Sequence, residues 1–326
     1  MVTLMEVEAA RGRIASLVIP TPTIHAHSLG LALGAQLYLK AEMLQRAGSF
    51  KLRGALNKIA KLPSPVRERG VVAASAGNHA QGVAMAAAHL GIPAVVVMPA
   101  TAPHSKSQAA RSYGAEVVLH GSTYHDAQDL ANRIARERQL TLIHAFDDPD
   151  VIAGQGTVGL EIVEDVPRFD DVIVPVGGGG LIAGIAIAVR ALRPGVRIIG
   201  VQSELAPAVA RSLALGAPTT VPPGPTIADG IAVDRPGDLA FAIIKEWVDE
   251  VVLVDEAYLV QAIALLAARS KLVAEGAGAA SLAAALSGAV DVDGRMVVLV
   301  LSGGNIDPEP LGAILSSACY SRPPSQ

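Results

Sequence analysis

Short runs of aliphatic and β-branched residues recur along the chain, and a turn and a helical pattern follow most of them. The runs are apolar throughout rather than alternating, which is typical of strands that are buried on both faces of a parallel sheet. They lie at 70–74, 94–99, 115–121, 171–176, 196–202, 250–255 and 295–301. At least seven predicted strands are too many to assign to a single sheet. We therefore predict an α/β protein of two domains, with mainly parallel, twisted sheets flanked by helices.

One helical segment between these runs shows the pattern most clearly. Residues 122–138, STYHDAQDLANRIARER, begin with two candidate N-cap residues, Ser122 and Thr123. A hydroxyl at that position accepts a hydrogen bond from a free N–H group of the first turn. The apolar stripe that should face the sheet comprises Ala127, Leu130 and Ile134.

Composition narrows the class of protein. The chain has 326 residues, of which 51% are hydrophobic and 17% charged, as in a compact protein with large buried elements. Its net charge of −4 argues against a nucleic-acid partner. The single cysteine, Cys319, excludes an intramolecular disulfide. The acidic N-terminal residues do not resemble a signal peptide, and the most apolar stretches are too short to span a membrane, so we expect a cytoplasmic protein.

The stretch VPVGGGGLIAG, residues 174–184, places four consecutive glycines between a predicted strand and a predicted helix. Several backbone N–H groups of such a run can approach one phosphate, helped by the positive end of the helix dipole. A simple turn does not need four glycines, since each adds conformational entropy to the unfolded chain. We therefore expect a phosphate site. Residues 178–183 also satisfy the looser dinucleotide pattern G-x-G-x-x-G/A, so a nicotinamide-binding domain is a rival.

Three further segments combine glycine with small polar residues near predicted strands, and ligands of open α/β sheets gather at the carboxyl ends of strands. In the first, Ser75 and Asn78 either cap the next helix or flank N–H groups that hold a carboxylate. In the last, Glu275 is also explained as an acid that the helix dipole favours. The segments are SAGNHAQG (75–82), LSGGNID (301–307) and AEGAGAASLAA (274–284).

The stretch GSFKLRGA poses the main chemical question. Lys51 follows Phe50 and precedes Arg53 by two positions, so it is either a solvated surface charge or an amine held for chemistry. Other kinds of site find little support. No CxxC or HExxH motif suggests a metal, and no G-x-S-x-G motif suggests a nucleophilic serine. His25 and His27 fit a structural role on a strand.

Taken together, these segments resemble one family, the threonine dehydratases of short, catabolic type. These are pyridoxal-phosphate (PLP) enzymes of fold type II, the tryptophan-synthase-β fold, and serine racemase belongs to the same group. The likeness spans most of the chain in order, and six segments together are specific. They are KAEMLQRAGSFKLRGA (40–55), SAGNHAQGVA (75–84), VIAGQGT (151–157), PVGGGGLIAG (175–184), ADGIAV (228–233) and LSGGNID (301–307).

The resemblance implies a role for each candidate residue. Lys51 would form the Schiff base with PLP and, once the substrate amine has displaced it, remove the Cα proton as general base. Phe50 would pack on the pyridine ring, Asn78 would bond the ring hydroxyl, and Ser302 would be the neutral partner of the ring nitrogen. The phosphate would lie on Gly177, Gly178, Gly179, Gly180 and Leu181. The substrate carboxylate would lie on the loop of Ser75, Ala76, Gly77, Asn78 and His79.

The implied reaction is the dehydration and deamination of L-threonine to 2-oxobutyrate and ammonia, and of L-serine to pyruvate. Serine racemases place a serine where this chain has Ala76, which carries no exchangeable proton, so a dehydratase is favoured. Racemases also bind a divalent ion through two acids, where this chain has Gln202 and Ala208. We therefore expect no magnesium at that position.

The fold that the resemblance implies has a smaller domain inserted in a larger one. We place the small domain at 60–147 and the large, PLP-binding domain at 1–59 plus 148–326, and we expect a homodimer or homotetramer. The short C-terminal part suggests no regulatory extension. Three alternatives stay open: a threo-3-hydroxyaspartate dehydratase or a serine racemase-like enzyme, a silent phosphate- or nucleotide-binding domain, and a nicotinamide oxidoreductase. A binding domain would have no use for a desolvated Lys51.

Overall fold

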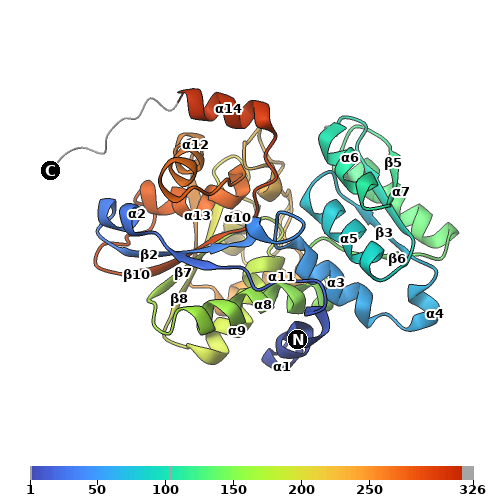
Figure 1. Cartoon of the computed structure of the whole chain (residues 1–326), viewed down its shortest axis with the longest axis horizontal. Helices are drawn as coiled ribbons and strands as arrows, with labels where there is room; N and C mark the ends of the chain where they lie inside the picture. The colour runs from blue at the N-terminus through green and yellow to red at the C-terminus, as the bar shows by residue number, and fades with distance from the viewer. Residues whose placement is uncertain (1, 103, 318–326) are drawn as a thin grey trace.

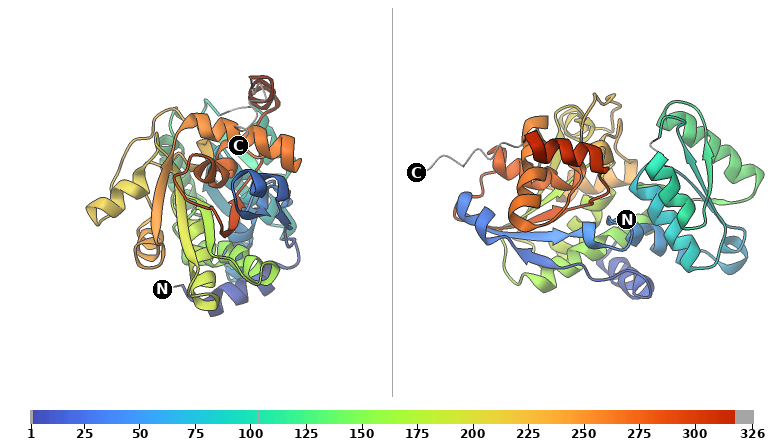
Figure 2. Two further views of the ribbon diagram at one scale, coloured as in Figure 1. Left: turned by 90° about the vertical axis from the view of Figure 1, so that its left-hand side faces the viewer. Right: turned by 45° about the horizontal axis from the view of Figure 1, so that its top comes forward.

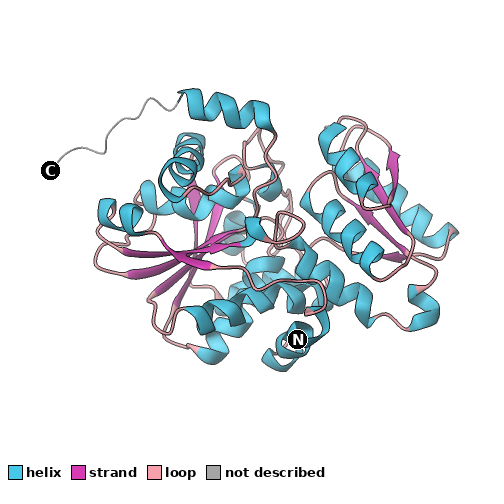
Figure 3. Cartoon of the chain, viewed as in Figure 1, coloured by secondary structure: helices cyan, strands magenta, loops and turns pink. Residues whose placement is uncertain are grey.

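The computed structural model describes residues 2–102 and 104–317, so Cys319 lies outside the described residues. The ribbon forms a larger and a smaller lobe, each built around one sheet with helices on both sides (Figure 1, Figure 3). The right-hand view of Figure 2 shows the strands and helices of residues 71–142, cyan to green, gathered on one side of the molecule. None of the helices in the described ranges is both long and apolar enough to cross a membrane.

The larger sheet has six strands in the order β1-β2-β10-β7-β8-β9. Only β1 runs antiparallel to its neighbour, and the other pairs are parallel. The strands are β1 (Thr23–His25), β2 (Gln36–Ala41), β7 (Asp171–Pro175), β8 (Arg197–Ser203), β9 (Glu250–Val254) and β10 (Met296–Leu301).

The smaller sheet has four parallel strands in the order β5-β4-β3-β6. They are β3 (Val71–Ala74), β4 (Ala94–Met98), β5 (Glu116–Leu119) and β6 (Thr141–Leu142). All of the predicted runs form strands, so the α/β fold class is confirmed. No predicted run marked β1, β2 and β6, of which β1 and β6 span only three and two residues. The domain limits at 60 and 147 stay a prediction.

Helices cover both faces of each sheet. The caps follow the expected chemistry at α7, where Thr123 rather than Ser122 is the N-cap and accepts the N–H of Asp126. The helices are α1 (Leu4–Ile14), α2 (His27–Ala32), α3 (Lys51–Lys61), α4 (Ser64–Arg67), α5 (Asn78–His89), α6 (His104–Ser112), α7 (Tyr124–Glu137), α8 (Pro149–Asp165), α9 (Gly180–Leu192), α10 (Ala208–Leu215), α11 (Asp238–Trp247), α12 (Glu256–Leu265), α13 (Gly276–Leu286) and α14 (Pro308–Ser317), with short helical turns η1 (Glu42–Leu44), η2 (Asp229–Ile231) and η3 (Leu266–Ser270).

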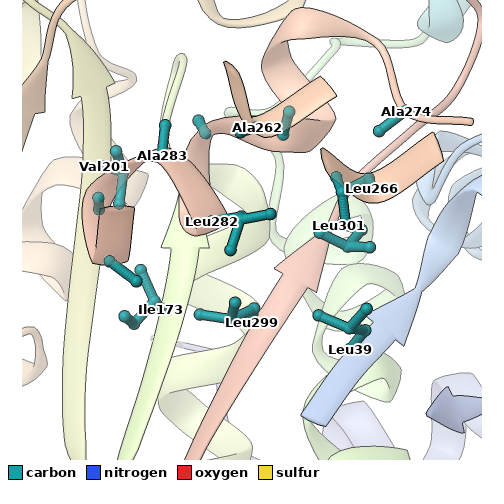
Figure 4. Packing of buried hydrophobic residues seen from close by; sticks show 14 of the residues in the cluster. Leu39, Ile173, Val201, Ala262, Leu266, Ala274, Leu282, Ala283, Leu299 and Leu301 are labelled. Carbon is teal, nitrogen blue, oxygen red and sulfur yellow. The ribbon is translucent and has the colours of Figure 1, made fainter. Parts of the chain in front are cut away.

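Strand β10 shows why the runs are apolar at every position. Leu299 and Leu301 face the layer of α12 and α13, together with Ile173 and Leu39 of neighbouring strands (Figure 4). Val298 and Val300 face the opposite layer, which contains residues of α8, α9 and α11. Successive side chains point to opposite faces, so both sets need an apolar partner. Burying each of these side chains contributes about 1.5–3 kcal/mol.

Helix α3, which begins at Lys51, is fixed by close packing against α8. A Cβ atom on Gly154 would lie 2.6 Å from both the carbonyl oxygen of Arg53 and the Cα atom of Gly54, so only glycine allows this approach. The Arg53 side chain is fully buried and donates to Glu42 at 2.8 Å and to Glu161 at 2.6 Å. A buried arginine requires such partners, because an unpaired charge there would be strongly destabilising. Arg53 therefore has a structural role.

Candidate active site

One cavity of about 850 Å³ lies between elements of the two lobes, at the carboxyl ends of β3, β7 and β10. Every site residue predicted from the sequence lines it, although the residues come from separate stretches of the chain. Those residues are Phe50, Lys51, Ser75, Ala76, Gly77, Asn78, His79, Gly177, Gly178, Gly179, Gly180, Leu181 and Ser302.

The amine of Lys51 is held inside this cavity rather than in bulk water. Its Nζ atom donates to the carbonyl oxygen of Ala145 at 3.0 Å and lies 5.0 Å from the centre of the Phe50 ring. Burial lowers the pKa of Lys51 from 10.5 to about 8, while the nearby Glu275 carboxyl opposes the change. At neutral pH roughly a tenth of a lysine with such a pKa is the free amine, against about one part in three thousand for an ordinary lysine.

Two helices point uncapped N-termini at the cavity. The N-cap of α9 is Gly179, with a φ of +98°, and the N-cap of α5 is Gly77; neither cap supplies a side-chain hydrogen bond. The first N–H groups of a helix need acceptors from elsewhere. Because both helix ends line one cavity, each can offer its free N–H groups to an anionic group bound there.

The glycine run is shaped by the segment 144–148, which the sequence analysis overlooked. A Cβ atom on Gly178 would lie 2.4 Å from the ring of Phe146, and one on Gly180 would lie 2.7 Å from the carbonyl oxygen of Phe146. Asp147 of the same segment accepts N–H groups at the start of α11. The segment thus places Ala145 beside Lys51 and Phe146 beside the glycines. No motif in the sequence marks these residues.

Asn78 is the first residue of α5 and does not cap it, and neither does Ser75, whose hydroxyl accepts the N–H of Gly77 at 3.1 Å. The Asn78 amide instead joins the two lobes. Its Nδ2 atom donates to Oε1 of Glu275 at 2.6 Å, and its Oδ1 atom accepts from Nδ2 of Asn305 at 2.7 Å. The side chain is therefore held at a fixed orientation.

Glu275 is a site residue to which the sequence analysis gave little weight. It precedes α13, is 6% exposed and lines the cavity. Burial raises the pKa of its carboxyl to about 7, and the charge of Asp229 adds to the effect. The helix dipole by itself favours an acid before a helix, so the sequence around Glu275 gives no sign of a ligand site. Only the residues that surround Glu275 in the fold show that it lies at the cavity wall.

The other predicted residues differ in what they can do. Burial lowers the pKa of His79 to about 3, and its Nε2–H donates to the carbonyl oxygen of Ile143 at 2.8 Å, so this ring is neutral and structural. Ser302 follows β10 and is 4% exposed. Gln202 accepts the N–H groups of Val209 and Ala210 through Oε1. The described part of the chain holds no cluster of three or more metal-ligating His, Cys, Asp or Glu residues.

These features fit a phosphorylated aldehyde. A buried amine of lowered pKa can attack a carbonyl, and the glycine run is a cradle whose close neighbours leave no space for a Cβ atom. The model of the family described as "Pyridoxal-phosphate dependent enzyme" matches residues 14–303. The chain therefore belongs to this family of PLP enzymes, and the predicted family, fold and cofactor are confirmed.

Similar proteins narrow the class further. The chain is 49% identical to the L-threonine ammonia-lyase of Thermotoga maritima, over 97% of this chain and 79% of that protein. It is 46% identical to the catabolic L-threonine dehydratase TdcB of Escherichia coli K12, over 94% of each. Among solved structures, a threonine deaminase from T.th. has a TM-score of 0.89 and 45% identity, covering 94% of this chain and 99% of that one. Maize serine racemase has a TM-score of 0.92 and 36% identity, covering 97% of each chain.

Proposed function

We propose that the protein is an L-threonine ammonia-lyase that also accepts L-serine, releasing ammonia and 2-oxobutyrate or pyruvate. The observation that carries the proposal is the convergence of Lys51, with its lowered pKa, and two uncapped helix N-termini on one cavity. One helix end suits a cofactor phosphate and the other suits the carboxylate of an amino acid.

We assign the cofactor contacts as follows. Gly177, Gly178, Gly179, Gly180 and Leu181 hold the phosphate, Phe50 packs on the ring, Asn78 bonds the ring hydroxyl, and Ser302 lies at the ring nitrogen. When bound, PLP supplies an aldehyde for the Lys51 amine and withdraws electrons from the Cα atom of the substrate. A hydroxyl at Ser302 does not force a proton onto the ring nitrogen as a carboxylate would.

The residues of the chain then divide the work on the substrate. The N–H groups at the start of α5 bind the carboxylate and orient the amino acid. Lys51 Nζ takes the Cα proton as general base, which its lowered pKa permits near neutral pH. Ala76, on the loop over the cavity, has no proton to return to Cα from its own side chain. This absence favours loss of the β-hydroxyl over racemisation.

The test is release of 2-oxo acid by the purified holoenzyme from L-threonine and L-serine. We expect turnover in the wild type and none in Lys51→Ala. Lys58→Ala is the matched control, because it removes a lysine two turns further along the same helix. Absence of oxo acid from both substrates, or full activity of Lys51→Ala, would contradict the proposal. D-Serine formed from L-serine faster than pyruvate would favour a racemase instead.

We also infer a cytoplasmic location and a homodimer or homotetramer. The single cysteine among the 326 residues supports the location, since a reducing compartment does not favour disulfides. The resemblance to the threonine dehydratases is the basis of the inferred assembly. Sedimentation equilibrium of the holoenzyme tests the second inference, and a monomer at micromolar concentration would contradict it.

A further inference from the structure

A group of charged side chains that we assign no cofactor contact lies in the cavity. Lys106 of α6, Asp229 of η2 and Glu275 line both the main cavity and a smaller one of about 240 Å³, so they form the wall between the two. Lys106 Nζ lies 2.6 Å from Oδ2 of Asp229, and the lysine side chain is only 19% exposed. This ion pair joins the smaller lobe to the larger one.

Acidic groups outnumber the lysine in this wall. Asp229, Glu275 and Asp307 each raise the pKa of Lys106, and Asp229 also raises the pKa of Glu275. The ammonium group of Lys106 is therefore favoured over the free amine, and Asp229 is its hydrogen-bonded carboxylate partner. A substrate carboxylate that approaches Lys106 therefore meets an ammonium whose charge Asp229 already neutralises.

The other basic side chains of the described lining offer no free cation either. His79 is neutral, and His125 Nε2 lies 2.7 Å from Oδ2 of Asp234. Lys51 is engaged in the proposed chemistry. The basic residues that line the cavity are Lys51, His79, Lys106 and His125. Two of these residues are lysines, and Lys106 is the one that pairs with an acid, Asp229, of the loop that carries η2.

We propose that Asp229 determines substrate specificity by occupying Lys106, so that the cavity accepts the neutral side chains of threonine and serine and rejects the second carboxylate of threo-3-hydroxyaspartate. The proposal rests on the proposed function and addresses one of its open alternatives. A buried carboxylate needs a cation or N–H partner. With Asp229 in place, the second carboxylate of the substrate meets Lys106 with its charge already neutralised and with further acidic groups around it.

The experiment compares kcat/KM for threo-3-hydroxyaspartate with kcat/KM for L-threonine in four holoenzymes: wild type, Asp229→Asn, Asp234→Asn and the double variant Lys106→Met/Asp229→Asn. Asp229→Asn removes the negative charge that neutralises Lys106 and keeps the shape of the side chain. We expect it to raise the ratio roughly tenfold or more, as a charged hydrogen bond to the second carboxylate forms. Circular dichroism and PLP content verify that each variant is folded and loaded.

The remaining variants separate the specific effect from a general one. Asp234→Asn removes the same charge from the same loop, so an equal gain there would mean that only the overall charge matters. The double variant should lose the gain of Asp229→Asn, because the freed lysine is absent. An unchanged ratio in Asp229→Asn would overturn the proposal, as would a wild type that uses hydroxyaspartate as well as threonine.

Failure of the proposed function gives a different pattern. A wild type that turns over neither substrate refutes the ammonia-lyase assignment. Binding is then followed by the cofactor absorbance on titration with L-aspartate and with L-alanine. Asp229→Asn must gain affinity for aspartate alone, and equal changes for both amino acids would overturn the specificity role.

Discussion

Placing an amine in a partly buried cavity should cost the protein stability, and Lys51 allows this cost to be measured. We consider the substitution Lys51→Met, which keeps the length of the side chain and removes the charge, with both proteins freed of cofactor. In the unfolded chain the amine has its ordinary pKa of 10.5, whereas burial lowers it to about 8 in the fold. The folded state therefore binds its proton more weakly than the unfolded state does.

The size of the effect follows from the two pKa values. A tenfold change in proton affinity is worth about 1.4 kcal/mol, so the difference corresponds to about 3 kcal/mol when the amine is protonated in both states. Lys51 faces a cavity and is only half-buried, and water there screens part of this cost. We expect Lys51→Met to raise the free energy of unfolding by about 1–3 kcal/mol at pH 7.

The pH dependence of the free energy of unfolding tests the direction of this effect. Below about pH 8 the amine is protonated in both states and the full cost applies. Between about pH 8 and pH 10.5 the unfolded state binds more protons, so the stability of the wild type rises with pH. The advantage of Lys51→Met should accordingly shrink across this range. Urea titrations followed by circular dichroism at pH 7 and at about pH 10 measure both values.

Lys58→Met supplies the matched control on the same helix. Lys58 lies 2.8 Å from Asp148 and 3.2 Å from Asp150, and these acids raise its pKa. Removing this lysine should destabilise the protein, the opposite of the effect at Lys51. Equal effects at the two positions, or a Lys51→Met protein less stable than the wild type at pH 7, would refute the reasoning.

Three more predictions follow from the geometry. Gly154→Ala should lower the free energy of unfolding by about 1–3 kcal/mol, because its Cβ meets the α3 backbone. At the exposed position 12 of α1, the added Cβ of Gly12→Ala meets nothing within 4 Å and should raise the free energy of unfolding by about 0.5–1 kcal/mol; urea titration compares the two variants. Gly178→Ala should weaken PLP binding at least tenfold by clashing with Phe146, and adding Phe146→Leu should restore part of it in cofactor titrations. Glu275→Gln should remove an ionisation near pH 7 from the pH profile of kcat/KM for threonine.

Seven of the strands and the cavity residues of the predicted motifs were predictable because each depends on a local pattern. An apolar run such as 295–301 has few interpretations other than a doubly buried strand, and Gly177 to Gly180 follow another such run. Parallel strands then bring the ends of such runs to one edge of a sheet. The resemblance to a family added the roles, which the patterns alone did not contain.

What the sequence could not reveal were pairings between distant and ordinary residues. Lys106 and Asp229 are 123 positions apart, and Asn78 and Glu275 are 197 apart. A lysine in a polar helix and an acid before an alanine-rich helix are both common, so neither carries a signal of its own. Their importance arises only when folding places them on one cavity wall, where burial raises the strength of each charge interaction.

The two lobes hold their side chains at the cavity by different kinds of contact. Arg53, two residues after Lys51, is fully buried and paired with Glu42 and Glu161, so the start of α3 is fixed within the larger lobe. The contacts that reach across the cavity from the smaller lobe are instead a few polar pairs beside open space, of Asn78 with Glu275 and Asn305 and of Lys106 with Asp229. Such partly exposed pairs can exchange partners at smaller cost than a fully buried ionic network can. The start of α3, which carries Lys51, is thus fixed by a buried network, whereas the polar groups of the smaller lobe meet the larger lobe through pairs that can exchange partners.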